Sequence, residues 1–259
     1  QNIIQDIMDT IENIKAEFNK CKNDPIHFIS NYIKVVHPIL GLTPFKLYPF
    51  QKRIISEFRN NRFNILRKFR QAGCTTLTSA YALWLTIFNN HKTIAILSIG
   101  DTESTEVLDK IKIMYDELPP WLQPGIIERN KHTLKLKTKS TIKSRPSGKT
   151  SGRSIAGSLL IVDEGAFIEN IDEIWASAYP ILSTGGNAIV LSTVNGVGNW
   201  FHLLYTDAID KVNRFNAIDI TWKEHPEYFY NPDFEWLYER KEAMGLPPVT
   251  EWEETTKAN

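Results

Sequence analysis

The sequence FNILRKFRQAGCTT, residues 63–76, joins an apolar run to a glycine turn and then to the start of a helical pattern. We predict a strand over residues 63–67 and a helix over residues 75–89. The first turn of a helix leaves its backbone N–H groups unpaired, so a strand, turn and helix in this order can bind phosphate. Thr75 occupies the position at which a hydroxyl would bind Mg²⁺ in a phosphate-binding loop. The stretch is therefore a candidate site for ATP and Mg²⁺.

This loop departs from the usual phosphate-binding pattern at two positions. Cys74 stands where a lysine is expected, and the first glycine of the motif is missing. Lys68 and Arg70, at the head of the loop, could reach back over the phosphates instead. Arg70 could also act as an arginine finger from within the same chain. A plain polar turn with two solvated surface cations is the alternative.

A glutamine ahead of the first strand completes the predicted nucleotide site. Residues 47–51 read LYPFQ. A glutamine presented from a loop can recognise the edge of adenine, and an aromatic side chain can stack on the base. A helix start with aromatic core residues is the alternative. The predicted ATP-binding residues are Gln51, Lys68, Arg70, Gln71, Ala72, Gly73, Cys74, Thr75 and Thr76.

A second stretch, SGKT at residues 147–150, resembles the end of a phosphate-binding loop but lacks its context. The motif requires a glycine five residues before Gly148, and Lys143 stands there. A short loop and then a strand follow, whereas a helix should begin. We interpret this segment as a loop without a phosphate site.

Another apolar run, LLIVDE at residues 159–164, ends in two carboxylates. Asp163 at the strand end would hold Mg²⁺, directly or through water. Glu164 would polarise the attacking water as the catalytic residue. An acidic turn after a strand is the alternative. However, one βα unit and a hairpin separate this run from the loop at residues 67–76, and this spacing makes a coincidental match less frequent. The spacing therefore favours the functional interpretation.

The run LSTVNG, residues 191–196, ends a further apolar strand in hydroxyl groups and an Asn-Gly turn. In additional-strand ATPases, a polar residue at the end of such a strand senses the γ-phosphate. Ser192, Thr193 and Asn195 are the polar residues at this strand end. A plain turn from strand to loop is the alternative.

The rest of the chain alternates buried strands with helices, which is typical of a mostly parallel α/β sheet covered on both faces. Such sheets bind ligands at the carboxyl ends of their strands. We divide the chain into an N-terminal helical part of a small lid (1–45), an α/β core (46–212) and a C-terminal part of the lid with a linker (213–259). We further predict strands over residues 93–99, 158–162, 188–193 and 215–221, and a hairpin over residues 133–143. Helices are predicted over residues 2–20, 105–118, 170–182 and 233–244, and another helix is predicted to begin at residue 24.

The composition argues against several classes of protein. Lys and Arg number 30, as do Asp and Glu, so no strongly basic nucleic-acid-binding coat is indicated. Cys21 and Cys74 lie far apart, which argues against a disulfide framework or a zinc site. No apolar run reaches the ~18 residues of a membrane span, and the N-terminus lacks the apolar core of a signal peptide.

Taken in this order, the motifs resemble the large terminase ATPase of tailed phages, especially the type found in contractile-tailed phages. The resemblance rests on RQAGCTT at 70–76, VDEGAF at 162–167 and STVNG at 192–196, with FISNYIK at 28–34 and LPPWLQPGI at 118–126. It implies a RecA-like P-loop core of the additional-strand (ASCE) class with a small lid subdomain. It also implies ATP and Mg²⁺ as ligands, and hydrolysis that drives DNA into a procapsid.

Roles and partners also follow from the resemblance. Ser192, Thr193 and Asn195 match the motif that couples hydrolysis to movement in the family. Arg153 falls where the family offers an arginine to the neighbouring subunit, and Arg145 is a competitor for that role. The expected partners are double-stranded DNA, the portal protein, the small terminase subunit and further copies of the chain in a ring, usually a pentamer. The expected location is the host bacterial cytoplasm, at the procapsid portal. Full-length terminases continue into an RNase H-like nuclease, and we expect no nuclease activity in this chain.

Two other functions remain open at this point. A helicase-like translocase of superfamily 2 shares the glutamine motif and the acidic pair, but it would need a second RecA domain. The other is a nucleotide-binding or assembly module without catalytic activity, in which Cys74 would mark the loss of the phosphate-binding motif.

Overall fold

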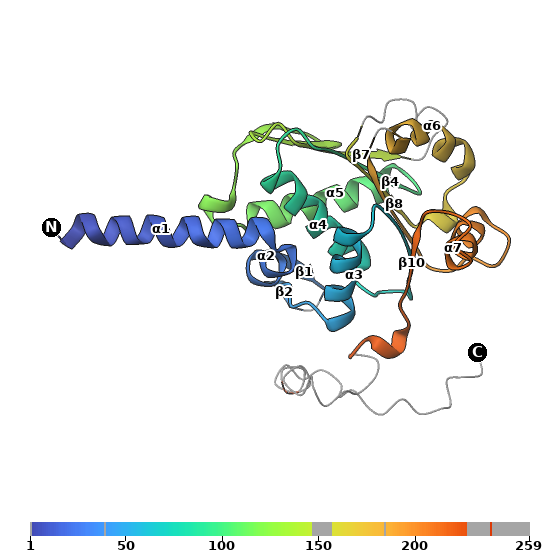
Figure 1. Cartoon of the computed structure of the whole chain (residues 1–259), viewed down its shortest axis with the longest axis horizontal. Helices are drawn as coiled ribbons and strands as arrows, with labels where there is room; N and C mark the ends of the chain where they lie inside the picture. The colour runs from blue at the N-terminus through green and yellow to red at the C-terminus, as the bar shows by residue number, and fades with distance from the viewer. Residues whose placement is uncertain (1, 39, 147–156, 184, 227–238, 240–259) are drawn as a thin grey trace.

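The computed structural model describes residues 2–38, 40–146, 157–183, 185–226 and 239, and its centre is an eight-stranded sheet (Figure 1). Six neighbouring strands run parallel, and the last two extend the sheet antiparallel. Across the sheet the strands are β10 (Asn216–Asp219), β3 (Phe63–Arg67), β9 (Asn187–Ser192), β8 (Leu159–Asp163), β4 (Thr93–Ser98), β7 (Thr141–Pro146), β6 (Thr133–Leu136) and β5 (Ile126–Arg129). The additional strand β9 thus separates β3 from β8.

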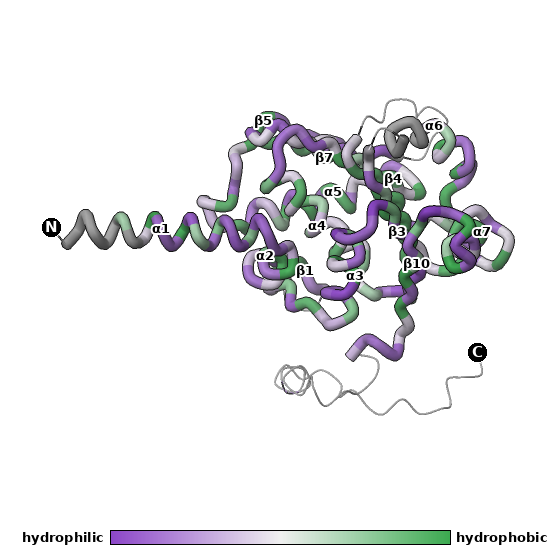
Figure 2. The backbone as a smooth tube through the Cα atoms, in the orientation of Figure 1, coloured by the Kyte–Doolittle hydropathy of each residue, from purple (hydrophilic) through white to green (hydrophobic). Residues whose placement is uncertain are grey.

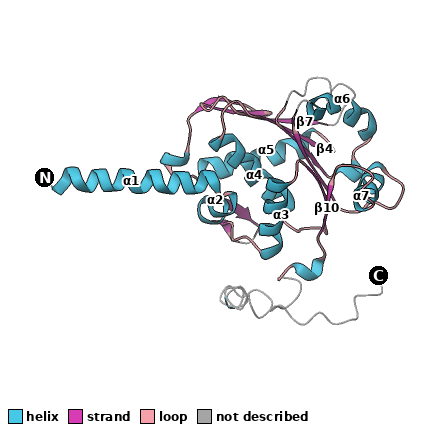
Figure 3. Cartoon of the chain, in the orientation of Figure 1, coloured by secondary structure: helices cyan, strands magenta, loops and turns pink. Residues whose placement is uncertain are grey.

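Helices cover both faces of the sheet (Figure 3). Successive side chains of a strand point to opposite faces, so Ile94 and Ile96 of β4 join one core while Ala95 and Leu97 join the other. The first core lies under α1 (Asn2–Asn23), α2 (Pro25–Tyr32), α3 (Pro49–Asn60), α4 (Cys74–Phe88) and α5 (Asp101–Asp116). The second lies under α6 (Ile171–Ser183) and α7 (Trp200–Ile209). Figure 2 shows hydrophobic segments gathered on the central strands.

Helix α4 is buried over most of its length, and it connects the phosphate loop to α1. At its far end the indole N–H of Trp84 donates to the carbonyl oxygen of Cys21 at 2.9 Å. The Phe88 ring packs edge-on against Phe18 of α1, with 5.1 Å between centroids. An apolar helix that is buried on all sides belongs to the core of its domain.

The junction of α1 and α2 forms as the sequence predicts. The Asp24 carboxylate accepts from the backbone N–H groups of Ile26 and His27 at 2.9 and 3.0 Å, and Pro25 opens α2. This is the N-cap and first-turn proline arrangement. The first half of α1 extends away from the rest of the chain (Figure 1), and Met8 and Ile11 are exposed on it.

The predicted α/β sheet is confirmed, but several elements were not predicted. These are helices α3 and α7, strand β5, and the hairpin of β1 (Lys34–His37) and β2 (Gly41–Pro44). The helix predicted over 105–118 begins four residues earlier, at Asp101. Residues 216–219, which the sequence groups with the C-terminal part of the lid, pair with β3 in the main sheet.

The helix predicted over 233–244 lies outside the described residues, apart from residue 239. Within the described part of the chain, no helix is both long enough and apolar enough to cross a membrane.

Candidate active site

The loop between β3 and α4 carries two backbone conformations that determine its shape. Gln71 and Gly73 have φ angles of +63° and +70°, in the left-handed region. This region suits glycine and is sparsely populated by other residues. Gly73 caps α4, which begins at Cys74, so the unpaired N–H groups of the first turn, including those of Thr75 and Thr76, lie directly after the loop. The strand, glycine turn and helix start therefore follow one another as predicted, and the binding of phosphate by this loop stays a prediction.

Cys74 faces the core. Its side chain is buried and belongs to the same apolar cluster as Ala72, and its Sγ lies 3.9 Å from the Ala72 carbonyl oxygen. Burial raises the pKa of the Cys74 thiol to about 12. The thiol is therefore neutral at physiological pH and cannot supply the positive charge that lysine supplies at this position of the usual motif.

Lys68 places a positive charge inside the site. Its backbone N–H donates to the Ser192 carbonyl oxygen at 3.0 Å, which fixes the residue beside β9. Its side chain is buried, and Nζ lies 2.5 Å from Oε1 of Glu164. Arg70, the other predicted replacement, is exposed and makes no ion pair with the described residues. Of the two candidate cations, Lys68 is the one that reaches the acidic pair.

Asp163 and Thr75 meet at the end of β8. The Thr75 hydroxyl lies 3.0 Å from each carboxylate oxygen of Asp163. Burial raises the pKa of Asp163, whereas the nearby Lys68 charge opposes the rise. A carboxylate and a hydroxyl that converge in this way are oxygen ligands of the kind that Mg²⁺ prefers. The predicted metal ligands therefore fit the ion.

Glu164 is held in place by several donors. Its backbone has φ +55° and ψ +43°, the left-handed conformation that is uncommon outside glycine and asparagine. Its Oε2 lies 3.2 Å from the Thr193 backbone N–H, 3.3 Å from the Ser192 hydroxyl and 3.4 Å from the Thr193 hydroxyl. Left-handed residues of this kind cluster at functional sites. The carboxylate thus bridges Lys68 on one side and the end of β9 on the other.

The predicted coupling residues contact the loop that follows β8. The Ser192 hydroxyl accepts from the Ala166 N–H at 3.2 Å, and the Asn195 amide donates to the Ala166 carbonyl oxygen at 3.0 Å. Together with the contacts of Thr193, these bonds join the end of β9 to the acidic loop. The structure thus brings all three predicted residues to the carboxyl edge of the sheet.

Gln51 lies in the first turn of α3, beside the phosphate loop. Its Oε1 accepts from the Tyr48 backbone N–H at 3.1 Å, and its Nε2 donates to the Ala72 carbonyl oxygen at 3.3 Å. The side chain is buried, and it supports the loop. Its role in recognising adenine stays a prediction.

His225 is a neighbour of this region that sequence reasoning missed. It follows η4 (Trp222–Glu224), and its ring lies 4.8 Å from that of Tyr48, 5.7 Å from Phe69 and 5.8 Å from Phe50. A single histidine far along the chain gives no sequence signal for such packing. The structure thereby joins the predicted adenine side to the segment after β10.

Two predicted features lie elsewhere. Arg153 and the SGKT stretch at 147–150 fall outside the described residues. Arg145, the competitor for the arginine in trans, lies on β7, and β4 separates that strand from β8.

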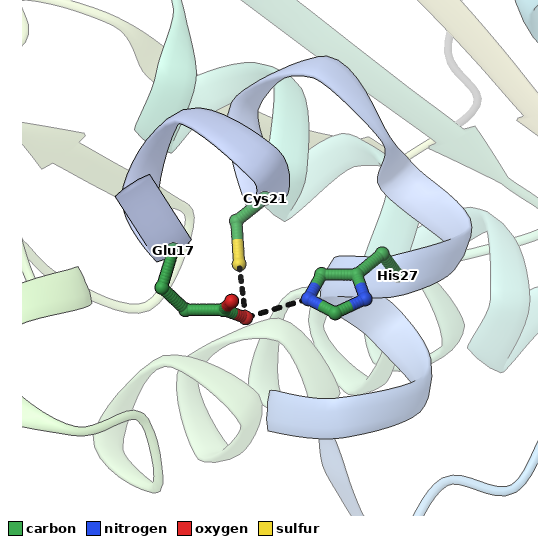
Figure 4. A group of neighbouring side chains, drawn as sticks. All are labelled: Glu17, Cys21 and His27. Carbon is green, nitrogen blue, oxygen red and sulfur yellow. Dashed lines mark hydrogen bonds and ion pairs between the residues drawn. The ribbon is translucent and has the colours of Figure 1, made fainter. Parts of the chain in front are cut away.

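A second cluster of chemically active side chains joins α1 to α2 (Figure 4). One oxygen of Glu17, Oε1, contacts His27 Nε2 at 2.5 Å, the Tyr32 hydroxyl at 2.8 Å and Cys21 Sγ at 3.8 Å. The hydrogen bonds from His27 and Tyr32 lower the pKa of Glu17, and burial raises the pKa of Cys21 to about 12. All of these contacts are hydrogen bonds or ion pairs to one carboxylate, so we interpret the cluster as a clasp between the two helices.

Known proteins resemble this chain in sequence and in fold. The sequence model described as "Terminase large subunit, T4likevirus-type, N-terminal" matches residues 65–253. The HK97 bacteriophage large terminase aligns with a TM-score of 0.63 at 19% identity, over 82% of this chain and 44% of that one. The Thermus phage P74-26 large terminase ATPase domain aligns at 0.55 and 18%, over 76% and 88%.

A third structure, the large terminase of the thermophilic bacteriophage D6E in complex with ADP, aligns with a TM-score of 0.55 at 16% identity. That alignment covers 75% of this chain and 50% of the D6E protein. At such identities the likeness establishes the fold. The chain spans about half the length of the HK97 and D6E proteins or less.

Proposed function

Because this chain belongs to the T4-type family of terminase large subunits, whose model matches residues 65–253, we propose that it is an ATP-hydrolysing motor unit. ATP hydrolysis would drive double-stranded DNA into a phage procapsid. The observation that carries the proposal is the position of Lys68, Glu164 and the end of β9 at one edge of the sheet. The D6E relative is described in complex with ADP, which supports a nucleotide at this edge.

The phosphates would bind the N–H groups of the first turn of α4, where the helix dipole favours negative charge. Lys68 would supply the cation that Cys74 cannot. Thr75 and Asp163 would hold Mg²⁺, which would supply positive charge to neutralise the bound phosphates. The buried Asp163 carboxylate is suited to this role, because a cation offsets the unfavourable burial of its charge.

Glu164 would orient the attacking water for in-line attack on the γ-phosphate. Its Oε1 is paired with the Lys68 ammonium group. An entering phosphate competes for the Lys68 ammonium, and this competition would free Oε1 to accept a hydrogen bond from water. The Thr193 N–H would keep Oε2 in place during the exchange.

Phosphate release would then be sensed through Ser192, Thr193 and Asn195. Their hydrogen bonds connect the Glu164 carboxylate to the Ala166 backbone, so a shift of the carboxylate would change the loop after β8. Arg70 and Arg153 are proposed as the cations that stabilise the transition state, the first in the same chain and the second in the neighbouring subunit. The exposed position of Arg70 leaves its side chain able to turn toward the phosphates.

The proposed partners are double-stranded DNA, the portal protein, the small terminase subunit and further copies of the chain, in a ring that is usually a pentamer. The proposed location is the host bacterial cytoplasm, at the procapsid portal. The family membership supports these partners.

The test is steady-state phosphate release with MgATP, measured over a range of protein concentrations beside a Glu164→Gln variant. We expect turnover that disappears in the variant. A rate per chain that rises with concentration would support an arginine donated in trans. Turnover that persists in the variant would contradict the proposed role of Glu164. Nucleotide binding without any turnover, with duplex DNA present or absent, would favour the silent module.

A further inference from the structure

The positive charges of this neutral chain are concentrated in one segment. From Arg129 to Val162 the sequence holds nine Lys and Arg residues and no Asp or Glu. The described part of the segment holds the end of β5, the strands β6 and β7 with the turn between them, and the start of β8; its described cations all lie between Arg129 and Arg145. A basic surface can therefore exist on a chain whose net charge is zero, and its field acts locally.

The strand register places three of these cations on one face of the sheet. Lys135 lies opposite Thr141, and Lys143 lies opposite Thr133, so both lysines belong to the same face. Arg145 follows Lys143 by two residues and shares that face, because side chains alternate along a strand. The opposite face packs into the core and carries Leu134, Leu136 and Ile142. We call Lys135, Lys143 and Arg145 the basic face.

No ion pair within the described residues neutralises the basic face. All three of its side chains are half-buried. By contrast, Arg129 and Lys131 at the start of the segment are paired with carboxylates of α5. Glu128 of β5 lies opposite Lys135 and lowers the local charge by one. Two more positive charges than negative ones therefore remain on this face, and half-buried charges without ion pairs favour the binding of an anion.

A hollow of about 430 Å³ lies at the end of β7, where Lys143 and Arg145 of the basic face line it together with His132 and Ser144, which alternate with them and belong to the opposite face. Its other lining groups include the hydroxyls of Thr133 and Ser144, which can donate hydrogen bonds to a phosphate oxygen. The carboxylate of Asp101 also lines the hollow; it is paired with Lys131 at 2.5 Å and lies 3.7 Å from Nε2 of His132. The hollow therefore offers donors and unpaired positive charge to an anion.

We propose that the basic face and this hollow bind the phosphate backbone of duplex DNA, an inference that rests on the proposed motor function. Successive cations are about 7 Å apart along the strands, since two residues of a strand span that length. Duplex DNA carries one negative charge per ~1.7 Å of its axis, so the row faces several phosphates. Contacts to the backbone alone carry no sequence information, which suits a motor that must move along any sequence.

The experiment measures the affinity of the chain for a fluorescent DNA duplex by anisotropy over a series of salt concentrations. The test variant is Lys135→Gln/Lys143→Gln. The matched control is Lys20→Gln/Lys52→Gln, which removes the same charge from exposed positions on α1 and α3. Melting temperatures establish that both variants fold. ATP turnover of each is measured in parallel.

We expect the test variant to lose affinity by roughly tenfold or more at low salt, while the control changes little. The slope of log affinity against log salt should fall by about two, one for each lysine that meets a phosphate. Basal ATP turnover should stay unchanged in both variants. Equal losses of DNA affinity in test and control, or no duplex binding by the unmodified chain at low salt, would overturn the inference.

The two proposals fail in different ways. Turnover that depends on Glu164, together with DNA binding that is indifferent to the basic face, would overturn this inference and leave the motor function standing. DNA binding that depends on the basic face, in a chain without ATP turnover, would sustain the inference and contradict the proposed hydrolysis.

Discussion

The ammonium group of Lys68 lies 2.5 Å from Oε1 of Glu164, while Oε2 of the same carboxylate meets the Thr193 backbone N–H at 3.2 Å. The lysine follows β3, and the glutamate follows β8. The ion pair therefore spans β9, the strand that separates them, and it joins the phosphate loop to the acidic loop. Four predictions follow from this site and from the cluster that joins α1 to α2.

Replacement of Lys68 by Ala should weaken MgATP binding and slow turnover by roughly 10²-fold or more, as expected for the loss of a charge aimed at the transition state. The loss is expected because Cys74 is neutral and faces the core. Phosphate release and calorimetric titration with a non-hydrolysable analogue would measure the two effects. The comparison variant is Arg70→Ala. If that variant binds the analogue as poorly as Lys68→Ala, Arg70 shares the binding role assigned here to Lys68.

Substitutions of Cys74 should affect folding more than chemistry. We expect Cys74→Ala to keep turnover within about threefold, since volume-reducing changes in a core cost stability first. Cys74→Lys should lower the melting temperature and leave turnover unimproved, because an ammonium group would enter an apolar cluster. Alkylation of the native thiol should be slow at neutral pH, since its pKa is about 12. Recovery of turnover by Cys74→Lys in a Lys68→Ala background would show that this side chain reaches the phosphates after all.

Gly73 and Gly41 form a matched pair for testing the shape of the phosphate loop. Both have positive φ, +70° and +64°. A Cβ on Gly73 would lie 3.0 Å from Gln51 Nε2, whereas a Cβ on Gly41 would meet nothing within 4 Å. Gly41→Ala should therefore cost about 1–2 kcal/mol of left-handed strain, and Gly73→Ala should cost more and also weaken ATP binding. Urea unfolding would measure the loss of unfolding free energy in each variant. Equal losses would argue against the contact with Gln51.

The clasp at Glu17 should make stability depend on acidic pH. The hydrogen bonds from His27 and Tyr32 lower the pKa of Glu17 in the folded chain. A lowered pKa stabilises the fold above the unfolded value of about 4.3, and this contribution is lost as the pH falls through the folded value. Glu17→Gln should therefore destabilise the chain at neutral pH and much less near pH 3.

Thermal melts across this pH range would test the clasp, with Glu12→Gln as the control on an exposed part of the same helix. A Glu17→Gln deficit that is the same at both ends of the range would mean that the carboxylate charge contributes nothing.

The sequence predicts those elements that are buried and that end in turn-forming or polar residues. Strand β3 was predicted with its observed bounds, and β8 and β9 within one residue, because apolar runs that end in polar side chains define them. Strand β5 is exposed at all four positions, so it has no alternation to detect. Helix α3 begins at Pro49 within residues read as an adenine motif, and the aromatic core interpretation of that stretch also holds.

The site could be predicted as a set of residues but not as a set of contacts. Motif order identifies Asp163, Glu164 and Thr75, since each follows a recognisable strand or turn. It leaves Lys68 and Arg70 as equal candidates, because the direction of a side chain depends on the packing of the loop. It also gives no sign that the Gln51 amide supports the loop at Ala72, which depends on a tertiary contact.

Helix α4 has a mechanical consequence because it is buried along its length. Its 15 residues form a stiff rod about 22 Å long. One end lies under the phosphate loop, and the other is bonded through Trp84 to the root of α1. A displacement of the first end would be carried to the second, where α1 leaves the body of the molecule. The projecting helix would then act as the outer arm of a lever whose short end lies at the phosphate loop.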